Sequence, residues 1–178
     1  HNSPRRQRQM CIRDSSRVDP NAIFQTKAGE ILVHRNIANL VPPYEYLTEH
    51  SGTIAAIEFG ITALNIKNIV ILGHSGCGGI KNGYHLCKDD KLDENTSIAN
   101  WLKLLLPAYK KLSDQNDKDA IGSLEKISII TSIDNLKSYP FIKRGIETNE
   151  IKIFGLWNDI GSGNIHAYNS KTNAFEII

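Results

Sequence analysis

The stretch Asn68-Ile-Val-Ile-Leu-Gly-His74-Ser-Gly-Cys77-Gly-Gly79 decides the fold class of this chain. Residues 69–72 are apolar and mostly β-branched, which favours a buried strand, and they run directly into a glycine-rich turn. Glycines allow the tight backbone turn that lets His74 and Cys77 face one point. An imidazole nitrogen and a thiolate are ligands that tetrahedral zinc prefers, so this turn is a candidate metal site.

From the residues alone, other interpretations of the turn stay open. The plainest is a strand–helix turn with an incidental His and a buried Cys. A nucleophilic-cysteine hydrolase could pair Cys77 with His74, and a glycine-rich turn before a helix can bind an anion or a nucleotide phosphate. The usual phosphate-loop and dinucleotide fingerprints do not match, because Gly79 and Lys81 stand where those motifs need lysine and glycine.

Strands and helices alternate on both sides of this turn. Strands are predicted at residues 30–35, 68–72, 127–131 and 151–156, and helices at residues 51–64, 98–112 and 135–143. Gly161-Ser-Gly163 predicts a hairpin turn before two short C-terminal strands. The predicted fold class is therefore α/β, a three-layer domain with a mostly parallel central sheet and an antiparallel C-terminal addition.

Composition places the chain among ordinary globular proteins. Its 178 residues are enough for one domain, and 40% hydrophobic with 22% charged residues argues against disorder. No window approaches the roughly 18 continuous apolar residues of a membrane helix, so no membrane partner is expected. Three cysteines are too few for a disulfide framework. Thiolate chemistry suits a reducing compartment, and a cytoplasmic location is expected.

The net charge of +2 comes from one end of the chain. Residues 1–15 contain Arg5, Arg6, Arg8 and Arg13 against a single acid, Asp14, while the remaining residues are almost neutral. No nucleic-acid partner is therefore expected for the body of the protein. The first 15 residues lack the apolar core of a signal peptide, and their composition matches nothing that follows.

Five segments resemble consecutive motifs of the β-class carbonic anhydrases, closest to the plant-type branch. They are Ser16-Arg17-Val-Asp19-Pro20, Val33-His-Arg35-Asn36-Ile-Ala-Asn39-Leu-Val-Pro42-Pro43-Tyr44, Gly52-Thr-Ile-Ala-Ala-Ile-Glu58-Phe, Gly73-His74-Ser-Gly-Cys77-Gly-Gly79-Ile-Lys and Gly155-Leu-Trp157-Asn-Asp159-Ile-Gly-Ser-Gly163. They occur in family order and cover Ser16 to about Tyr168. The resemblance implies a zinc lyase that interconverts carbon dioxide and bicarbonate, and it implies a homo-oligomer.

The resemblance also implies a ligand set of two cysteines and one histidine. It places the histidine at His74 and the second cysteine at Cys77. The first cysteine and an aspartate come from a C-x-D-S-R motif whose last two residues align with Ser16-Arg17. In direct register, those two positions hold Arg13 and Ser15. Neither residue can replace its counterpart, since a guanidinium repels a cation and a hydroxyl is a poor partner for an arginine.

Two accounts of this departure follow. In the first, a two-residue insertion brings Cys11 to the metal and pairs Asp14 with Arg17, which in the family keeps the aspartate off the zinc. In the second, residues 1–15 are a non-family tail, disordered or foreign, that packs poorly, and residues 16–178 form the carbonic anhydrase-like domain. The second account predicts a truncated or non-catalytic family member with an incomplete zinc site, and it is the one favoured here.

Three apolar residues and the remaining cysteine give weaker indications of function. Three apolar residues fall where the family lines a small substrate pocket, which suits carbon dioxide, although plain core packing explains them equally well: Leu32, Ile37 and Phe59. Cys87 lies beyond a polar stretch from Cys77, and we interpret it as a bystander rather than a ligand.

Overall fold

The computed structural model of the protein describes residues 9–13, 18–46, 51–92 and 95–178. The strands are β1 (Gln9–Arg13), β2 (Ile31–Arg35), β3 (Asn68–His74), β4 (Lys152–Asn158), β5 (Ile165–Asn169) and β6 (Ala174–Ile177). The α-helices are α1 (Pro20–Phe24), α2 (Gly52–Thr62), α3 (Gly78–Lys88), α4 (Ser97–Leu102), α5 (Leu106–Tyr109), α6 (Ala120–Lys137) and α7 (Pro140–Glu147). Short 3₁₀ helices are η1 (Ile37–Asn39), η2 (Tyr44–Tyr46) and η3 (Lys103–Leu105).

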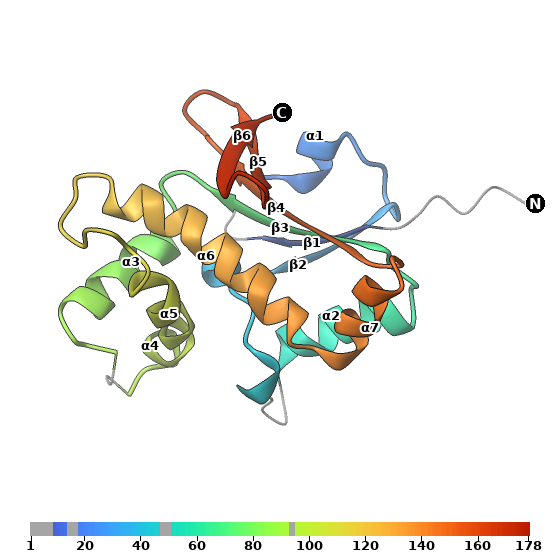
Figure 1. Ribbon diagram of the computed structural model, residues 1–178, viewed down its shortest axis with the longest axis horizontal. Coiled ribbons are helices and arrows are strands. Elements are labelled where there is room, and N and C mark those ends of the chain that lie inside the picture. Colours follow the sequence, from blue (N-terminus) through green and yellow to red (C-terminus); the bar gives the residue numbers. More distant parts are fainter. Residues whose placement is uncertain (1–8, 14–17, 47–50, 93–94) are drawn as a thin grey trace, which may run out of the picture.

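The described strands form one sheet in the order β2-β1-β3-β4-β5-β6 (Figure 1). The first four strands in that order are parallel to one another, whereas β5 and β6 are antiparallel. A mostly parallel sheet with an antiparallel C-terminal addition was predicted, and the topology confirms it. The turn after β3 therefore lies at the carboxyl edge of the parallel strands.

The two faces of the sheet are covered unequally. Alternate residues of β1 point to opposite faces, as the period of a strand requires. Met10 and Ile12 join the larger core cluster together with residues of α2, α6 and α7. Cys11 joins a smaller cluster on the other face, which α1 covers through Ile23 and Phe24. Figure 1 shows the same arrangement, with α6, α2 and α7 on one side of the sheet and α1 on the other.

A second core lies beside the sheet, among the short helices that follow the His74 turn. α3, α4 and α5 gather against the amino-terminal part of α6 (Figure 1). Their buried side chains include Ile80, Tyr84, Leu102, Leu105 and Leu124. The predicted long helix at residues 98–112 is instead divided into α4, η3 and α5, with Pro107 in the first turn of α5. Proline lacks the N–H that a continuous helix would use at that point.

Capping contacts define the starts of two helices. The Ser51 Oγ atom accepts a hydrogen bond from the Ile54 N–H at 3.4 Å, at the start of α2. The Thr96 Oγ1 atom accepts one from the Ala99 N–H at 3.2 Å, at the start of α4. Both bonds satisfy backbone donors that have no partner inside the helix, which is why hydroxyl residues favour these positions.

The predicted strand at residues 127–131 is wrong, because this segment lies inside α6. Its β-branched residues favour a strand locally, but its burial follows the helical period: Leu124, Ser128, Ile129, Ser132 and Leu136 are buried. Packing of this stripe against the sheet outweighs the local preference. α6 is the longest helix described, at 18 residues, and no helix in the described part of the chain is long and apolar enough to cross a membrane.

The expectation that residues 1–15 pack poorly is wrong for five of them. Gln9–Arg13 form β1, which lies between β2 and β3 in the middle of the parallel part of the sheet. Met10, Cys11 and Ile12 are each 0% exposed. The short apolar run of these residues is thus enough to build a strand once both neighbours supply backbone hydrogen bonds. Residues 1–8 and 14–17 lie outside the described part of the chain.

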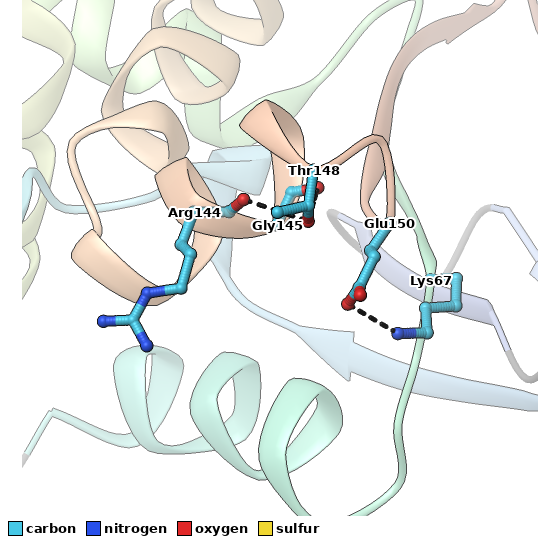
Figure 2. Close-up of polar contacts among 5 residues, drawn as sticks. All are labelled: Lys67, Arg144, Gly145, Thr148 and Glu150. Atoms are coloured by element: carbon cyan, nitrogen blue, oxygen red, sulfur yellow. Dashed lines mark hydrogen bonds and ion pairs between the residues drawn. The ribbon is translucent and has the colours of Figure 1, made fainter.

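The amino ends of the strands lie at the edge opposite the His74 turn, and Figure 2 shows this region. Lys67, directly before β3, forms a 3.1 Å ion pair with Glu150, two residues before β4. The Thr148 hydroxyl donates to the carbonyl oxygens of Arg144 (3.2 Å) and Gly145 (3.3 Å) and so caps the end of α7. These contacts join the amino ends of the two central strands.

Candidate metal site

The predicted turn joins β3 to α3 and buries both candidate donors. β3 ends at His74, and Cys77 is the N-cap residue of α3. Between them, Gly76 has φ +67°, a left-handed conformation that glycine adopts readily. His74 is 2% exposed and Cys77 is 1% exposed. The two side chains therefore lie at the carboxyl edge of the parallel strands, where sheets of this kind bind their ligands.

The imidazole of His74 is oriented by its own backbone. The Nδ1 atom lies 2.9 Å from the carbonyl oxygen of Ser75. A carbonyl oxygen only accepts hydrogen bonds, so Nδ1 carries the proton in this contact and Nε2 carries the lone pair. Bonding of one ring nitrogen to a backbone carbonyl is how many metal-binding histidines fix their tautomer and present the other nitrogen.

The thiol of Cys77 lies at the amino end of a helix. The Sγ atom accepts a hydrogen bond from the Ile80 N–H at 3.4 Å, as a capping side chain does. Backbone N–H groups and the positive end of the helix dipole both favour negative charge at this place. A thiolate, which is the form of cysteine that binds metals, is therefore stabilised at Cys77.

A residue that the sequence analysis missed lies in contact with the turn. Glu125 of α6 is 3% exposed, and its Oε1 atom accepts a hydrogen bond from the Cys77 N–H at 2.9 Å. Its Oε2 atom accepts one from the indole N–H of Trp157 at 3.1 Å. Burial raises the pKa of Glu125, although these hydrogen bonds oppose the rise. The sequence analysis did not identify Glu125 as buried, because it predicted a strand at residues 127–131 and so did not recognise the helix to which Glu125 belongs.

The loop after β4 contacts the turn from the other side. The hydroxyl of Ser75 donates to Asp159 Oδ1 at 3.1 Å and accepts from the Ile160 N–H at 2.8 Å. Asp159 also accepts from the Ser162 hydroxyl at 2.7 Å and from the Gly161 N–H at 3.0 Å. These bonds, chiefly the one from Ser162, lower the pKa of Asp159. The segment between His74 and Cys77 is thus held by two elements, α6 and the β4–β5 loop.

Known proteins are similar to this chain in sequence. Residues 11–165 match the family model described as carbonic anhydrase. β carbonic anhydrase 3 of Arabidopsis thaliana is 39% identical over 153 residues, which cover 83% of this chain and 58% of that protein. The carbonic anhydrase of Helicobacter pylori strain J99 is 37% identical over 174 residues, covering 94% of this chain and 77% of that protein. The chain belongs to the β-class carbonic anhydrase family.

Solved structures of β-class carbonic anhydrases have the same fold. The β-carbonic anhydrase CcaA superposes with a TM-score of 0.87 at 30% identity, covering 97% of this chain and 84% of that one. A tetrameric β-carbonic anhydrase of Sordaria macrospora gives a TM-score of 0.73 at 26% identity, covering 91% and 80%. The chain spans little more than half the length of the Arabidopsis relative.

The structure separates Cys11 from the His74 turn, which contradicts the insertion account. Cys11 pairs with Val70 of β3, four residues before His74. At about 3.3 Å per residue, this offset is about 13 Å along the strand. The Cys11 side chain packs with Val18, Val70 and Leu72 on the face that α1 covers. Among the described residues, no group of three His, Cys, Asp or Glu side chains could hold a metal ion.

The register of β1 agrees with the direct alignment of the family motif. Arg13, at the position of the family's first cysteine, pairs with Leu72, two residues before His74. The backbone of Arg13 is therefore closer to the turn than that of Cys11. Asp14 and Arg17, the predicted catalytic pair, lie outside the described residues. The match to the family model starts at residue 11, within the segment interpreted as a tail.

Of the three predicted pocket residues, Ile37 lies against the turn. A Cβ atom added to Gly79, at the start of α3, would come within 2.7 Å of the Ile37 Cγ2 atom. Leu32 instead contacts the region of Gly60 and packs against the larger core cluster, and it pairs with Met10. Phe59 is 55% exposed on α2. Within one chain, the structure does not bring Leu32 to His74.

Cys87 lies at the far end of α3 from Cys77. Ten residues of helix at about 1.5 Å per residue separate the two by about 15 Å. The side chain is half-buried, and burial raises the pKa of Cys87 to about 11. Its thiol is therefore protonated at neutral pH. These observations support its interpretation as a bystander.

Proposed function

We propose that this chain binds zinc through His74 and Cys77 and catalyses the reversible hydration of carbon dioxide to bicarbonate. The observation that supports this proposal most directly is the buried turn after β3, which presents one imidazole and one thiol at the carboxyl edge of the sheet in a β-class carbonic anhydrase. An anion- or nucleotide-binding role has less support, because the first turn of α3 is already capped by the Cys77 thiol.

The two donors suit zinc in their chemistry. The Nε2 atom of His74 carries the lone pair, and the Cys77 Sγ atom lies where a helix favours a thiolate. A third protein ligand is not among the described residues.

Each of the chain's own residues has a distinct task in this proposal. When bound, zinc lowers the pKa of a coordinated water towards about 7. His74 and Cys77 hold the ion, and the contacts of Ser75 and Glu125 hold the turn that carries them. Ile37, which is 47% exposed beside the start of α3, offers an apolar surface that suits carbon dioxide. Arg17 is the candidate partner for a carboxylate of the amino-terminal motif.

Zinc content and hydration activity of a His74→Ala variant test the proposal. The variant is expected to lose bound zinc and activity while remaining folded. His85→Ala is the matched control, since His85 is an exposed histidine on α3 and should leave both unchanged. Zinc retained at full stoichiometry in the folded His74→Ala variant would contradict the site.

A second candidate function is a family member that keeps the fold but lacks a complete zinc site. One observation favours it: Cys11 is buried in the core, and Arg13 occupies the register position of the family's first cysteine. Metal analysis of the wild-type chain separates the two candidates. Purified protein without zinc, and without hydration activity in added zinc, would support the second one.

We also propose that the chain assembles with copies of itself. Several large apolar side chains are exposed: Ile37, Tyr44, Phe59, Phe154, Ile160, Ile177 and Ile178. The Sordaria macrospora relative described above is tetrameric, and at 26% identity it supports an assembly of this kind. Light scattering coupled to size-exclusion chromatography tests this, and a monodisperse monomer at micromolar concentration would contradict it.

A further inference from the structure

Glu125 is unusual because its carboxylate is buried. It is the one Asp, Glu, Lys or Arg among the described residues that are buried. Removing a carboxylate from water is costly unless hydrogen bonds replace the lost hydration. Both oxygens of Glu125 have such bonds, one from the Cys77 N–H at 2.9 Å and one from the Trp157 indole at 3.1 Å. The two bonds offset this cost, and they tie Glu125 to the backbone of Cys77 and to the side chain of Trp157.

The first of these bonds acts on the backbone of a candidate ligand. Cys77 is the N-cap residue of α3, so its N–H precedes the helix and has no acceptor within it. Glu125 supplies that acceptor from α6. Fixing the backbone of Cys77 fixes the direction of its Cα–Cβ bond, and hence the region that the Sγ atom can reach.

The second bond makes Glu125 itself rigid. Trp157 lies on β4, directly across from Gly73 of β3, one residue before His74. The indole ring is held by an edge contact with His166 (centroids 5.2 Å apart) and by the Lys126 ammonium 4.4 Å from its centroid. A side chain with both oxygens bonded to two different elements cannot rotate without losing a bond. The chain Trp157–Glu125–Cys77 therefore connects the sheet to the turn.

We propose that Glu125 is a positioning residue for the metal site, which holds the backbone of Cys77 so that its thiolate and the imidazole of His74 meet at one ion. This inference rests on the proposed zinc function. Residues that orient metal ligands typically contribute 10- to 100-fold to metal affinity.

Glu125→Gln is the first test, because it keeps the shape but leaves one oxygen. Its amide oxygen can accept from Cys77 or from Trp157, and its NH₂ group then faces the other donor. Zinc affinity, measured by competition with a chelator, is expected to fall 10- to 100-fold while the protein stays folded. Glu147→Gln is the matched control, since Glu147 is an exposed glutamate on α7 and should not change the affinity.

A rescue variant separates positioning from general damage. In Glu125→Gln with Trp157→Phe, the indole donor is absent, so the amide oxygen can return to the Cys77 N–H. Zinc affinity is then expected to recover at least tenfold relative to Glu125→Gln alone. A folded Glu125→Gln variant with zinc affinity within twofold of the wild type would overturn the proposal, as would a double variant that shows no recovery.

A metal-independent measurement distinguishes this inference from the proposed function. In protein without metal, hydrogen exchange of the Cys77 amide is expected to accelerate in Glu125→Gln, whereas the Lys81 amide, which bonds to the Cys77 carbonyl at 3.0 Å, is affected less. If the wild type binds no zinc, the proposed function fails, but hydrogen exchange of the Cys77 amide still tests whether Glu125 positions Cys77. An exchange rate at Cys77 that is the same in Glu125→Gln and in the wild type would overturn the positioning role.

Discussion

Gly73 and Ile129 are in such close contact that a larger residue at position 73 would have to displace the Ile129 side chain. A Cβ atom added to Gly73 would lie 2.8 Å from the Ile129 Cδ1 atom and 3.3 Å from the Asn39 Oδ1 atom. Gly73 directly precedes His74, so this contact sets how closely α6 approaches the end of β3. The close packing of α6 also brings Glu125 within reach of Cys77.

Gly73→Ala is therefore expected to destabilise the protein by about 1–3 kcal/mol, as overpacking of a core does. The measurement is urea unfolding at neutral pH. Gly78→Ala is the matched control: Gly78 begins α3, and a Cβ atom there meets nothing within 4 Å. Alanine favours helices over glycine by roughly 0.5–1 kcal/mol, so this control should be neutral or stabilising. Equal effects of the two substitutions would argue against the close packing.

Cys11→Ser tests the assignment of Cys11 to the core. The side chain is 0% exposed among apolar neighbours, so a hydroxyl in its place should cost about 1–3 kcal/mol of stability. Zinc content of the folded variant should equal that of the wild type. Loss of zinc from folded Cys11→Ser protein would restore the insertion account, in which Cys11 is a ligand.

Arg13→Cys combined with Ser15→Asp rebuilds the family motif directly before Ser16 and Arg17. Arg13 pairs with Leu72, so its backbone is near the end of β3. A third protein ligand, here a second thiolate, should contribute about 3 kcal/mol, which is roughly a 100-fold gain in zinc affinity. Isothermal titration with zinc measures the gain. Ser15→Asp alone is the control and should give much less, and a double variant no better than this control would refute the register argument.

Asp159→Asn is expected to change how stability depends on pH. Hydrogen bonds from Ser162, Gly161 and Ser75 lower the pKa of Asp159 in the folded protein. A lowered folded pKa stabilises the protein above the unfolded pKa of about 3.9, and this contribution disappears as the pH falls through the folded value. The difference in unfolding free energy between wild type and variant should therefore be constant near pH 7 and shrink below about pH 4. A difference that stays constant down to pH 2 would contradict the role of these bonds.

The sequence predicted the parts of the fold that depend on local signals. The run before His74 is apolar and β-branched, and the hydroxyl of Ser51 stands at a helix start, so β3 and α2 were placed correctly. The two candidate donors could be identified because they share one turn. In each of these cases, the structure that the local sequence favours is the structure that is observed.

The parts that were missed depend on contacts between distant segments. Residues 127–131 form a helix because one stripe of α6 packs on the sheet, and periodicity over so short a window could not show this. The polar surroundings of Gln9 and Arg13 concealed β1, whose two neighbours supply its pairing. Glu125 has no motif around it. Its role depends on hydrogen bonds that it accepts from Cys77 and Trp157, which are 48 and 32 positions away in the sequence.

The place of β1 inside the sheet has a consequence for synthesis on the ribosome. β1 is made first, yet one of its two neighbours, β3, begins only at Asn68. A nascent chain that ends before Asn68 carries Met10 and Ile12 without the strand and helices that bury them, and such exposed apolar segments are aggregation-prone. Ribosome-bound chains stalled before Asn68 should therefore remain sensitive to protease. Release of the growing chain from chaperones is expected to wait until β3 has been translated.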